Sequence, residues 1–133
     1  MSLLFNPAQR VNPAAPEEPK KWYPVIRSTG MKKERDVAKE IADETTLNPK
    51  EAEMAIYQLE KIMLRWLLEG KTVQLGELGT FRITAKCTGV DSEEEVTATQ
   101  IKKLNLRFQP SVRLKESIAK AHFTPADSLI IKR

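Results

Sequence analysis

Lysine and arginine residues gather on two segments in the second half of the chain, at positions that face the same way. Thr80–Lys86 alternates polar and apolar residues, which predicts a β-strand with one buried face. Arg82 and Lys86 fall on its polar face, and Arg107 falls on the polar face of a second alternating segment, Leu104–Phe108. Cationic side chains on such a surface can neutralise phosphate groups without reading base sequence. The candidate phosphate-binding residues are Arg82, Lys86, Lys102, Lys103, Arg107, Arg113 and Lys115.

The charge of the whole chain gives this interpretation only weak support. The 133 residues carry a formal net charge of +4 and have a pI near 9.2. Residues 32–123, however, hold 16 basic and 15 acidic side chains, so most of the excess lies towards the two ends. Because nucleic-acid-binding domains usually carry a clear basic excess, an ordinary solvated surface is the alternative interpretation.

No other group of residues suggests catalysis or metal binding. His122 is the only histidine, and a lone histidine without a nearby nucleophile favours a structural role. Cys87 is the only cysteine, which excludes an intrachain disulfide and fits a reducing compartment. Gly76 and Gly79 lack the lysine of a phosphate-binding loop, and the acidic residues 91–95 lack the spacing of a calcium loop. We predict no enzyme activity, cofactor, metal or small-molecule substrate.

Two helices are predicted to precede the strands. The first covers Lys32–Thr46, where apolar residues recur at helical spacing. The second begins at once, because Asn48 suits the N-cap, Pro49 suits the first helical position and Glu51 stands where a capping-box acid belongs.

The second helix carries an apolar stripe that one short helix cannot cover. It is predicted to end at Leu68 or Glu69, before a C-terminal glycine, Gly70. The stripe consists of Ala52, Ala55, Ile56, Leu59, Ile62, Met63, Trp66 and Leu67. Only 6% of the residues are aromatic, and a small aliphatic core often needs a partner subunit. We therefore expect this helix to be buried partly against a second copy of the chain.

The strands meet at a corner bounded by glycines, Leu75–Ile83. A short strand, Thr72–Leu75, enters the corner, and its two glycines are expected to form a turn with positive φ. Thr97 is placed to cap a helical turn in the segment between the two long strands. Ser111 is placed to cap a last helix.

The two ends are predicted to be extended appendages. Four of the eight prolines lie in residues 1–21, where Leu3–Phe5 can form a short edge strand and residues 12–21 a linker. Trp22–Arg27 is rich in aromatic and β-branched residues; Pro24 places it at a sheet edge, and its aromatic rings are expected to pack on the core. The predicted divisions are an extension with an edge strand (1–31), a folded domain (32–123) and a tail (124–133) in which residues 129–131 can form a strand.

The chain shows no predicted membrane or export segment. It holds no run of 18 apolar residues that would predict a transmembrane helix, and residues 1–10 lack the apolar stretch of a signal peptide. We therefore expect a cytoplasmic protein.

From about Lys32 to Phe123 the sequence resembles the HU/IHF family of bacterial histone-like DNA-binding proteins. The resemblance rests on an ordered series of motifs: Leu47–Ala52, Glu69–Leu75, Leu78–Arg82, Phe108–Ser111 and Leu114–Lys115. The N-terminal extension, with Trp22–Val25 and Ser28–Gly30, is similar to that of longer HU-like variants in the Bacteroidetes.

The resemblance implies an α+β fold: a helical hairpin, a three-stranded antiparallel sheet with a β-arm, and a C-terminal helix, in an intertwined homodimer. In typical members the arms embrace the DNA minor groove, and a proline at each tip wedges between base steps. This sequence departs from that pattern, since no proline occurs between Pro49 and Pro110. Residues 82–103 balance four basic against four acidic residues, and Glu93–Glu95 stand near the expected tip.

The leading hypothesis is a non-enzymatic bacterial nucleoid protein that binds double-stranded DNA as a homodimer. It would contact the duplex backbone with little sequence preference and contribute to DNA condensation. The alternative is a structural or protein-interaction module on the HU scaffold that has lost DNA bending or DNA binding. The acidic, proline-free arm motivates that alternative.

Overall fold

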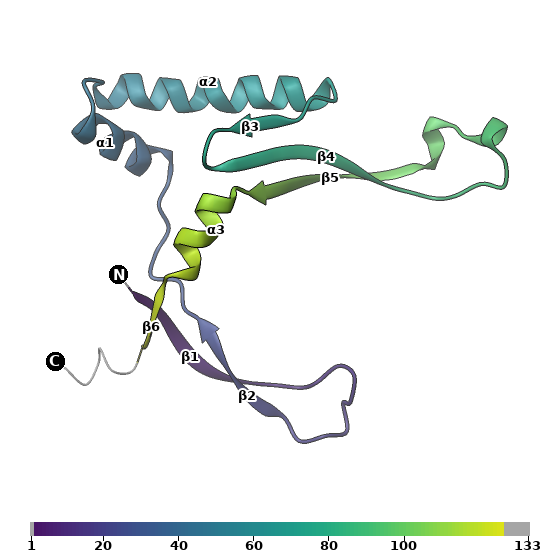
Figure 1. Cartoon of the computed structure of the whole chain (residues 1–133), viewed down its shortest axis with the longest axis horizontal. Helices are drawn as coiled ribbons and strands as arrows, with labels where there is room; N and C mark the ends of the chain where they lie inside the picture. Colours follow the sequence, from purple (N-terminus) through teal and green to yellow (C-terminus); the bar gives the residue numbers. More distant parts are fainter. Residues whose placement is uncertain (1, 127–133) are drawn as a thin grey trace. The chain divides into compact units, whose positions relative to one another are not determined.

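The computed structural model describes residues 2–126, and the chain divides into two compact units (Figure 1). Residues 33–116 form the central unit, and residues 2–32 together with residues 117–126 form the described part of the terminal unit. The described chain contains three α-helices and two three-stranded sheets, which confirms the predicted α+β class.

The central unit begins with the predicted helical hairpin. Helix α1 spans Glu34–Glu44 and helix α2 spans Pro49–Leu68. The backbone N–H of Glu51 donates to Oδ1 of Asn48 at 2.8 Å, and Nδ2 of Asn48 donates back to Oε1 of Glu51. These bonds confirm the predicted start of α2, and Gly70, with φ of 83°, follows its end as predicted. The two helices pack on each other, and their most buried residues include Ala38 and Ala52.

An antiparallel sheet follows, in the order β3-β4-β5. Its strands are β3 (Val73–Leu75), β4 (Gly79–Cys87) and β5 (Ile101–Pro110). The loop between β3 and β4 is the predicted glycine-bounded corner, with φ of 47° at Gly76 and 152° at Gly79.

Strands β4 and β5 continue past β3 as a long hairpin (Figure 1). Two short 3-10 turns, Glu93–Glu95 and Ala98–Gln100, lie between them. The backbone N–H of Thr97 donates to Oε1 of Gln100 at 2.7 Å, and Nε2 of Gln100 donates to the carbonyl of Thr88 at 2.7 Å. The predicted helical turn after Thr97 is therefore present, and it is tied to Thr88, the residue that follows β4.

Helix α3 spans Val112–Ala119 and begins at the predicted cap, Ser111. The hydroxyl of Ser111 accepts a bond from the backbone N–H of Leu114 at 3.0 Å and donates to the carbonyl of Glu77. The backbone N–H of Ser111 also donates to the carbonyl of Leu78 at 3.2 Å. The glycine-bounded corner therefore fixes the start of α3.

The terminal unit is a sheet in the order β2-β1-β6, and it corrects two expectations. Strand β1 spans Ser2–Arg10 and lies in the middle of this sheet, so the prediction of a short edge strand at residues 3–5 is wrong. Strand β2 (Lys21–Ile26) is an edge strand as predicted. Residues 11–20 form the loop of the β1–β2 hairpin rather than a linker between separate parts of the chain. Strand β6 (His122–Pro125) pairs parallel to β1 and includes the first residues of the predicted tail. The strand expected at residues 129–131 lies outside the described residues.

The aromatic residues of β2 do not pack on a core in the described chain. Trp22 is 66% exposed and Tyr23 is 40% exposed, so the predicted anchoring role is wrong there. Successive residues of a strand point to opposite faces of the sheet, and these two neighbouring rings therefore cannot enter the same core.

Candidate nucleic-acid interface

The polar face of the β4–β5 hairpin brings four of the predicted cations together as two directly opposed pairs. Arg82 lies opposite Arg107, and Lys86 lies opposite Lys103. Residues that are directly opposite in an antiparallel ladder share a face, as do residues two apart along a strand. All four cations therefore lie on one face, and the two pairs are separated by about 13 Å along the strands, since each residue advances about 3.3 Å.

The residues between and beside these pairs are uncharged and polar. Thr84 lies opposite Asn105 between the two cationic pairs, and Thr80 lies opposite Gln109 next to the corner. Hydroxyl and amide groups also bind phosphate oxygens. Alternation along the strands was enough to place Thr84 on this face, but the pairing with Asn105 required the register.

The two cationic pairs have no anionic partner in the described chain. Among residues 2–126, the ion pairs join Lys71 to Glu69 at 3.1 Å and Arg113 to Glu77 at 3.7 Å. Directly opposed like charges destabilise a β-ladder by roughly 0.2–1 kcal/mol per pair. An anionic ligand on this face would remove that cost.

The opposite face of the hairpin is apolar. Phe81 lies opposite Phe108, and their rings are tilted by 35° with centroids 4.7 Å apart. Further along, Leu104 and Leu106 belong to the same face but are 57% and 60% exposed. The predicted core face of β5 is thus in place, although the described chain leaves much of it uncovered.

The other three predicted cations do not join the opposed pairs. The register is irregular at Lys102: Lys86 pairs with Lys103 and Cys87 pairs with Ile101, so Lys102 has no partner residue on β4. Its ammonium group donates to the carbonyl of Thr99 at 3.3 Å. Arg113 and Lys115 lie on α3.

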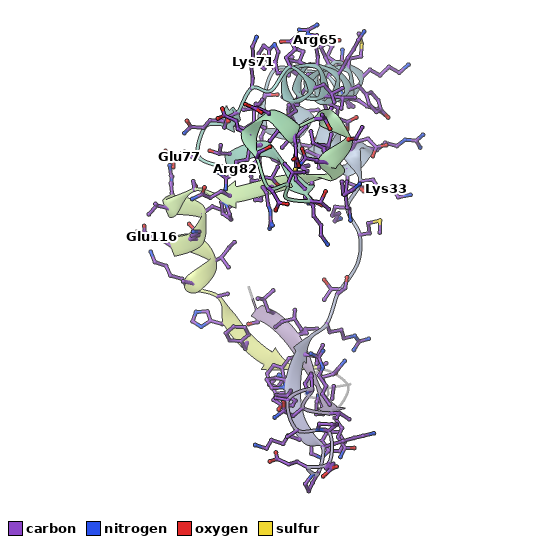
Figure 2. The ribbon with its side chains drawn as sticks, turned by 90° about the vertical axis from the view of Figure 1, so that its right-hand side faces the viewer. Lys33, Arg65, Lys71, Glu77, Arg82 and Glu116 are labelled. Atoms are coloured by element: carbon purple, nitrogen blue, oxygen red, sulfur yellow. The ribbon has the colours of Figure 1, made fainter. Side chains whose placement is uncertain are left out.

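Arg113 contacts the acidic side chain of the corner. Its Nη1 lies 3.7 Å from Oε2 of Glu77, with both side chains largely exposed. Figure 2 shows Glu77 at the end of the unit where α3 begins. An ion pair so exposed contributes about 0–1 kcal/mol, so Arg113 can exchange Glu77 for another anion at little cost.

The tip of the hairpin has the opposite charge from its polar face. Residues 88–100 contain four acidic and no basic residues: Asp91, Glu93, Glu94 and Glu95. Val90 and Val96 beside them are 40% and 63% exposed. The tip therefore offers carboxylates and aliphatic groups, which a phosphate backbone does not attract.

Helix α2 leaves large apolar side chains exposed. Met54, Leu64 and Leu68 are 69%, 60% and 67% exposed, and Trp66 is 40% exposed. Leu64 and Leu68 are four residues apart and share a face of the helix, and exposed apolar residues grouped in this way are typical of protein interfaces.

One tyrosine links the two helices of the hairpin. The hydroxyl of Tyr57 lies 3.2 Å from Oε1 of Glu53 and 3.3 Å from Oε1 of Glu34. Partial desolvation, followed by the hydrogen bond to Glu53 and the charges of both carboxylates, raises the pKa of Tyr57 above its ordinary value. The neutral hydroxyl is thus the form that joins α1 to α2.

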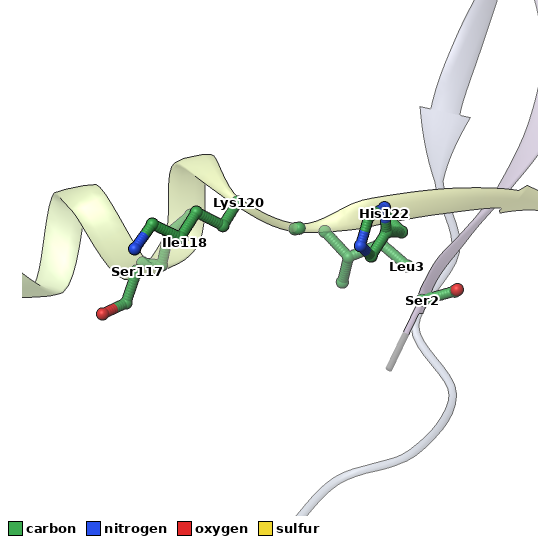
Figure 3. Close-up of a pocket in the computed structure, with 7 residues that line it drawn as sticks. Ser2, Leu3, Ser117, Ile118, Lys120 and His122 are labelled. Atoms are coloured by element: carbon green, nitrogen blue, oxygen red, sulfur yellow. The ribbon is translucent and has the colours of Figure 1, made fainter.

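His122, the only histidine in the sequence, lies in the terminal unit beside an open hollow of about 870 Å³. Leu3, Ile118 and His122 line this hollow, and His122 is exposed (Figure 3). Residues 2–126 contain no cluster of three or more metal-ligating side chains. None of the helices within that range is long and apolar enough to cross a membrane.

Comparison with known proteins identifies related sequences and structures. The family model described as "HU domain fused to wHTH, Ig, or Glycine-rich motif" matches residues 1–125. A solved structure described as a "putative bacterial DNA binding protein" from Bacteroides vulgatus ATCC 8482 is similar to the chain, with a TM-score of 0.62 and 12% sequence identity. The similarity covers 95% of this chain and 49% of that one, so this chain spans about half the length of its structural relative. The sequence matches no curated protein.

Proposed function

The chain belongs to the HU-HIG family, the HU domains fused to wHTH, Ig or glycine-rich motifs, and we propose that its central unit binds double-stranded DNA through the backbone phosphates. The observation that carries the proposal is the two pairs of opposed cations on the polar face of the β4–β5 hairpin, Arg82 with Arg107 and Lys86 with Lys103. The name of the structural relative from Bacteroides vulgatus adds support.

The proposed binding has little sequence preference. Arginine and lysine on a β-ribbon reach phosphates from either strand, and phosphate contacts carry no direct sequence information. Lys102, Arg113 and Lys115 supply weaker contacts at either end of the hairpin. A cytoplasmic, nucleoid-associated role follows from this mode of binding.

We propose that the protein binds as a homodimer. The exposed apolar residues of α2 and the uncovered leucines of β5 supply surface for a second copy. A dimer would also double the number of opposed cationic pairs available to one duplex, which raises the affinity through multiple contacts.

Insertion of the hairpin tip between base pairs is not part of the proposal. Proteins that kink DNA in this way use an apolar wedge, commonly proline, at the tip. Here the tip carries four carboxylates and no proline. The polar face nearer the body of the unit is the part that contacts DNA.

A titration of duplex DNA across a range of salt concentrations tests this function. For each phosphate contact, the logarithm of the binding constant should fall with a slope of about 0.9 against the logarithm of the salt concentration. Replacing Lys86 and Lys103 by alanine should reduce the slope by about 1.8 per subunit, since two phosphate contacts are lost. If the protein does not bind duplex DNA even at low ionic strength, the proposal is rejected.

The second candidate function is a protein-interaction module that does not bind DNA. The acidic hairpin tip, with Val90 and Val96 exposed beside its carboxylates, is the observation that favours it. Charge reversal at Arg82, Lys86 and Arg107 separates the two candidates. A large loss of duplex affinity supports DNA binding, whereas unchanged affinity supports the interaction module.

A further inference from the structure

The terminal unit carries the basic excess of the chain. Its described residues, 2–32 and 117–126, include six lysines and arginines but only two acidic side chains, Glu17 and Glu18. The central unit, residues 33–116, holds 14 basic and 15 acidic side chains. A polyanion is therefore attracted to the terminal unit more strongly than to the average surface of the central unit.

The β1–β2 hairpin of this unit contains a third opposed pair of cations. Arg10 lies directly opposite Lys21, and Tyr23 lies opposite Ala8. Lys21 and Tyr23 are two residues apart on one strand, so they share a face with Arg10. Neither Arg10 nor Lys21 forms an ion pair within the described chain. Like charges in this position destabilise the ladder, and an anion bound between them would remove that cost.

An aromatic ring and a hollow lie beside these cations. Tyr23 is 40% exposed and, with Arg10 and Pro13, lines an open hollow of about 490 Å³ at the end of the hairpin. Trp22, on the other face of the strand, lies opposite Gln9. A cationic pair next to an exposed ring fits a phosphate followed by an unstacked base, because bases stack on aromatic rings while lysine and arginine follow the backbone.

We propose that the β1–β2 hairpin is a site for single-stranded nucleic acid. Arg10 and Lys21 bind the phosphates, and the ring of Tyr23 stacks on an unpaired base. This site is separate from the duplex-binding face of the central unit and does not depend on it. The combination would allow one chain to hold both a duplex and an unpaired strand.

Fluorescence anisotropy with a labelled 20-nucleotide oligothymidylate tests the proposal on the full chain. Arg10→Glu with Lys21→Glu should lower the affinity by about tenfold or more at low salt, because two phosphate contacts become repulsive. Tyr23→Leu, which keeps an apolar side chain, should lower it by about fivefold or more through the loss of stacking. The matched charge control is Lys39→Glu with Lys50→Glu, on exposed positions of α1 and α2, which should bind the probe nearly as the unaltered chain does.

Two further measurements keep the result specific. Arg10→Gln with Lys21→Gln relieves the repulsion within the hairpin, so it should fold at least as stably as the unaltered protein and still lose affinity. Arg82→Glu with Arg107→Glu should weaken duplex binding and leave oligothymidylate binding unchanged. The proposal is overturned if the Arg10 and Lys21 variants bind oligothymidylate with unchanged affinity. It is also overturned if these variants lose affinity only for the duplex. An oligouridylate probe shows whether the site prefers RNA to DNA.

Discussion

Arg82 lies directly opposite Arg107 in the β4–β5 ladder, so two guanidinium groups share one face of the hairpin with no carboxylate among the described residues to neutralise them. The same arrangement recurs with Lys86 and Lys103. Opposed like charges weaken the hairpin in the absence of a ligand. The arrangement therefore links the stability of the hairpin to the occupation of its polar face.

Replacing one member of the first pair should have opposite effects on folding and binding. Arg107→Glu converts repulsion with Arg82 into attraction, so the free energy of unfolding should rise by roughly 0.2–1 kcal/mol in urea denaturation. Duplex affinity at low salt should fall at the same time, because a phosphate contact is lost and a negative charge is added. Lys39→Glu, on α1, changes the net charge by the same amount and should leave duplex affinity almost unchanged. Weaker folding together with full DNA affinity would contradict the idea that this face binds phosphate.

Gly79 is the residue of the corner that tolerates least change. Its φ is 152°, and a Cβ added there would meet the carbonyl oxygen of Gln109 and lie 2.7 Å from Cε1 of Phe108. Gly79→Ala should therefore lower the free energy of unfolding by about 1–3 kcal/mol, measured by urea denaturation. Gly89→Ala is the control, since no atom beyond Gly89 and its two chain neighbours lies within 4 Å of a Cβ built there, and a change within about 0.5 kcal/mol is expected. Equal effects of the two substitutions on the free energy of unfolding would show that contacts with Gln109 and Phe108 do not restrict Gly79.

The parts of the fold that local signals specify could be predicted from the sequence. Asn48 with Glu51 marked the start of α2, and Ser111 marked the start of α3. Alternation identified the polar face of the long hairpin. Alternation could not identify which residues are opposed. The register depends on the conformation of the segment between the strands and on the irregularity that leaves Lys102 without a partner residue.

The terminal unit was harder to predict, because its sheet depends on residues that are far apart in the sequence. Ser2 pairs with His122, and no local pattern signals that contact. The four-residue strand β6 is also too short to show alternation. For the same reason the opposed pair of Arg10 and Lys21 was not among the predicted site residues, although both cations and the nearby aromatic residues are plain in the sequence.

Ionisation of Tyr57 should weaken the helical hairpin at alkaline pH. Its pKa is raised from 10.0 by partial desolvation and by Glu53 and Glu34, so the folded state holds the phenolic proton more tightly than the unfolded state. The resulting stabilisation is fully present below pH 10 and is lost as the pH rises through the raised pKa of the folded state. Absorbance titration of the phenolate should show this late component, which Tyr57→Phe should remove and Glu53→Gln should shift to lower pH. A component that Glu53→Gln leaves in place would show that the carboxylate is not a cause of the shift.

Leu64 is the residue with which to test whether α2 forms the dimer interface. It is 60% exposed in the single chain and shares a face of α2 with Leu68, which is 67% exposed. In a dimer that buries this face, Leu64→Glu places a charge in an apolar contact, so the species in solution should shift from a dimer towards the 15.1 kDa single chain. Met31→Glu is the matched control, because Met31 is 80% exposed and lies outside the helices, and it should leave the dimer intact.

Sedimentation equilibrium distinguishes the dimer from the single chain. Duplex affinity should fall together with dimerisation, since each subunit then contributes its cationic pairs alone. If the unaltered protein sediments as a single chain and still binds the duplex, the exposed face of α2 serves a different partner and one central unit is sufficient for binding.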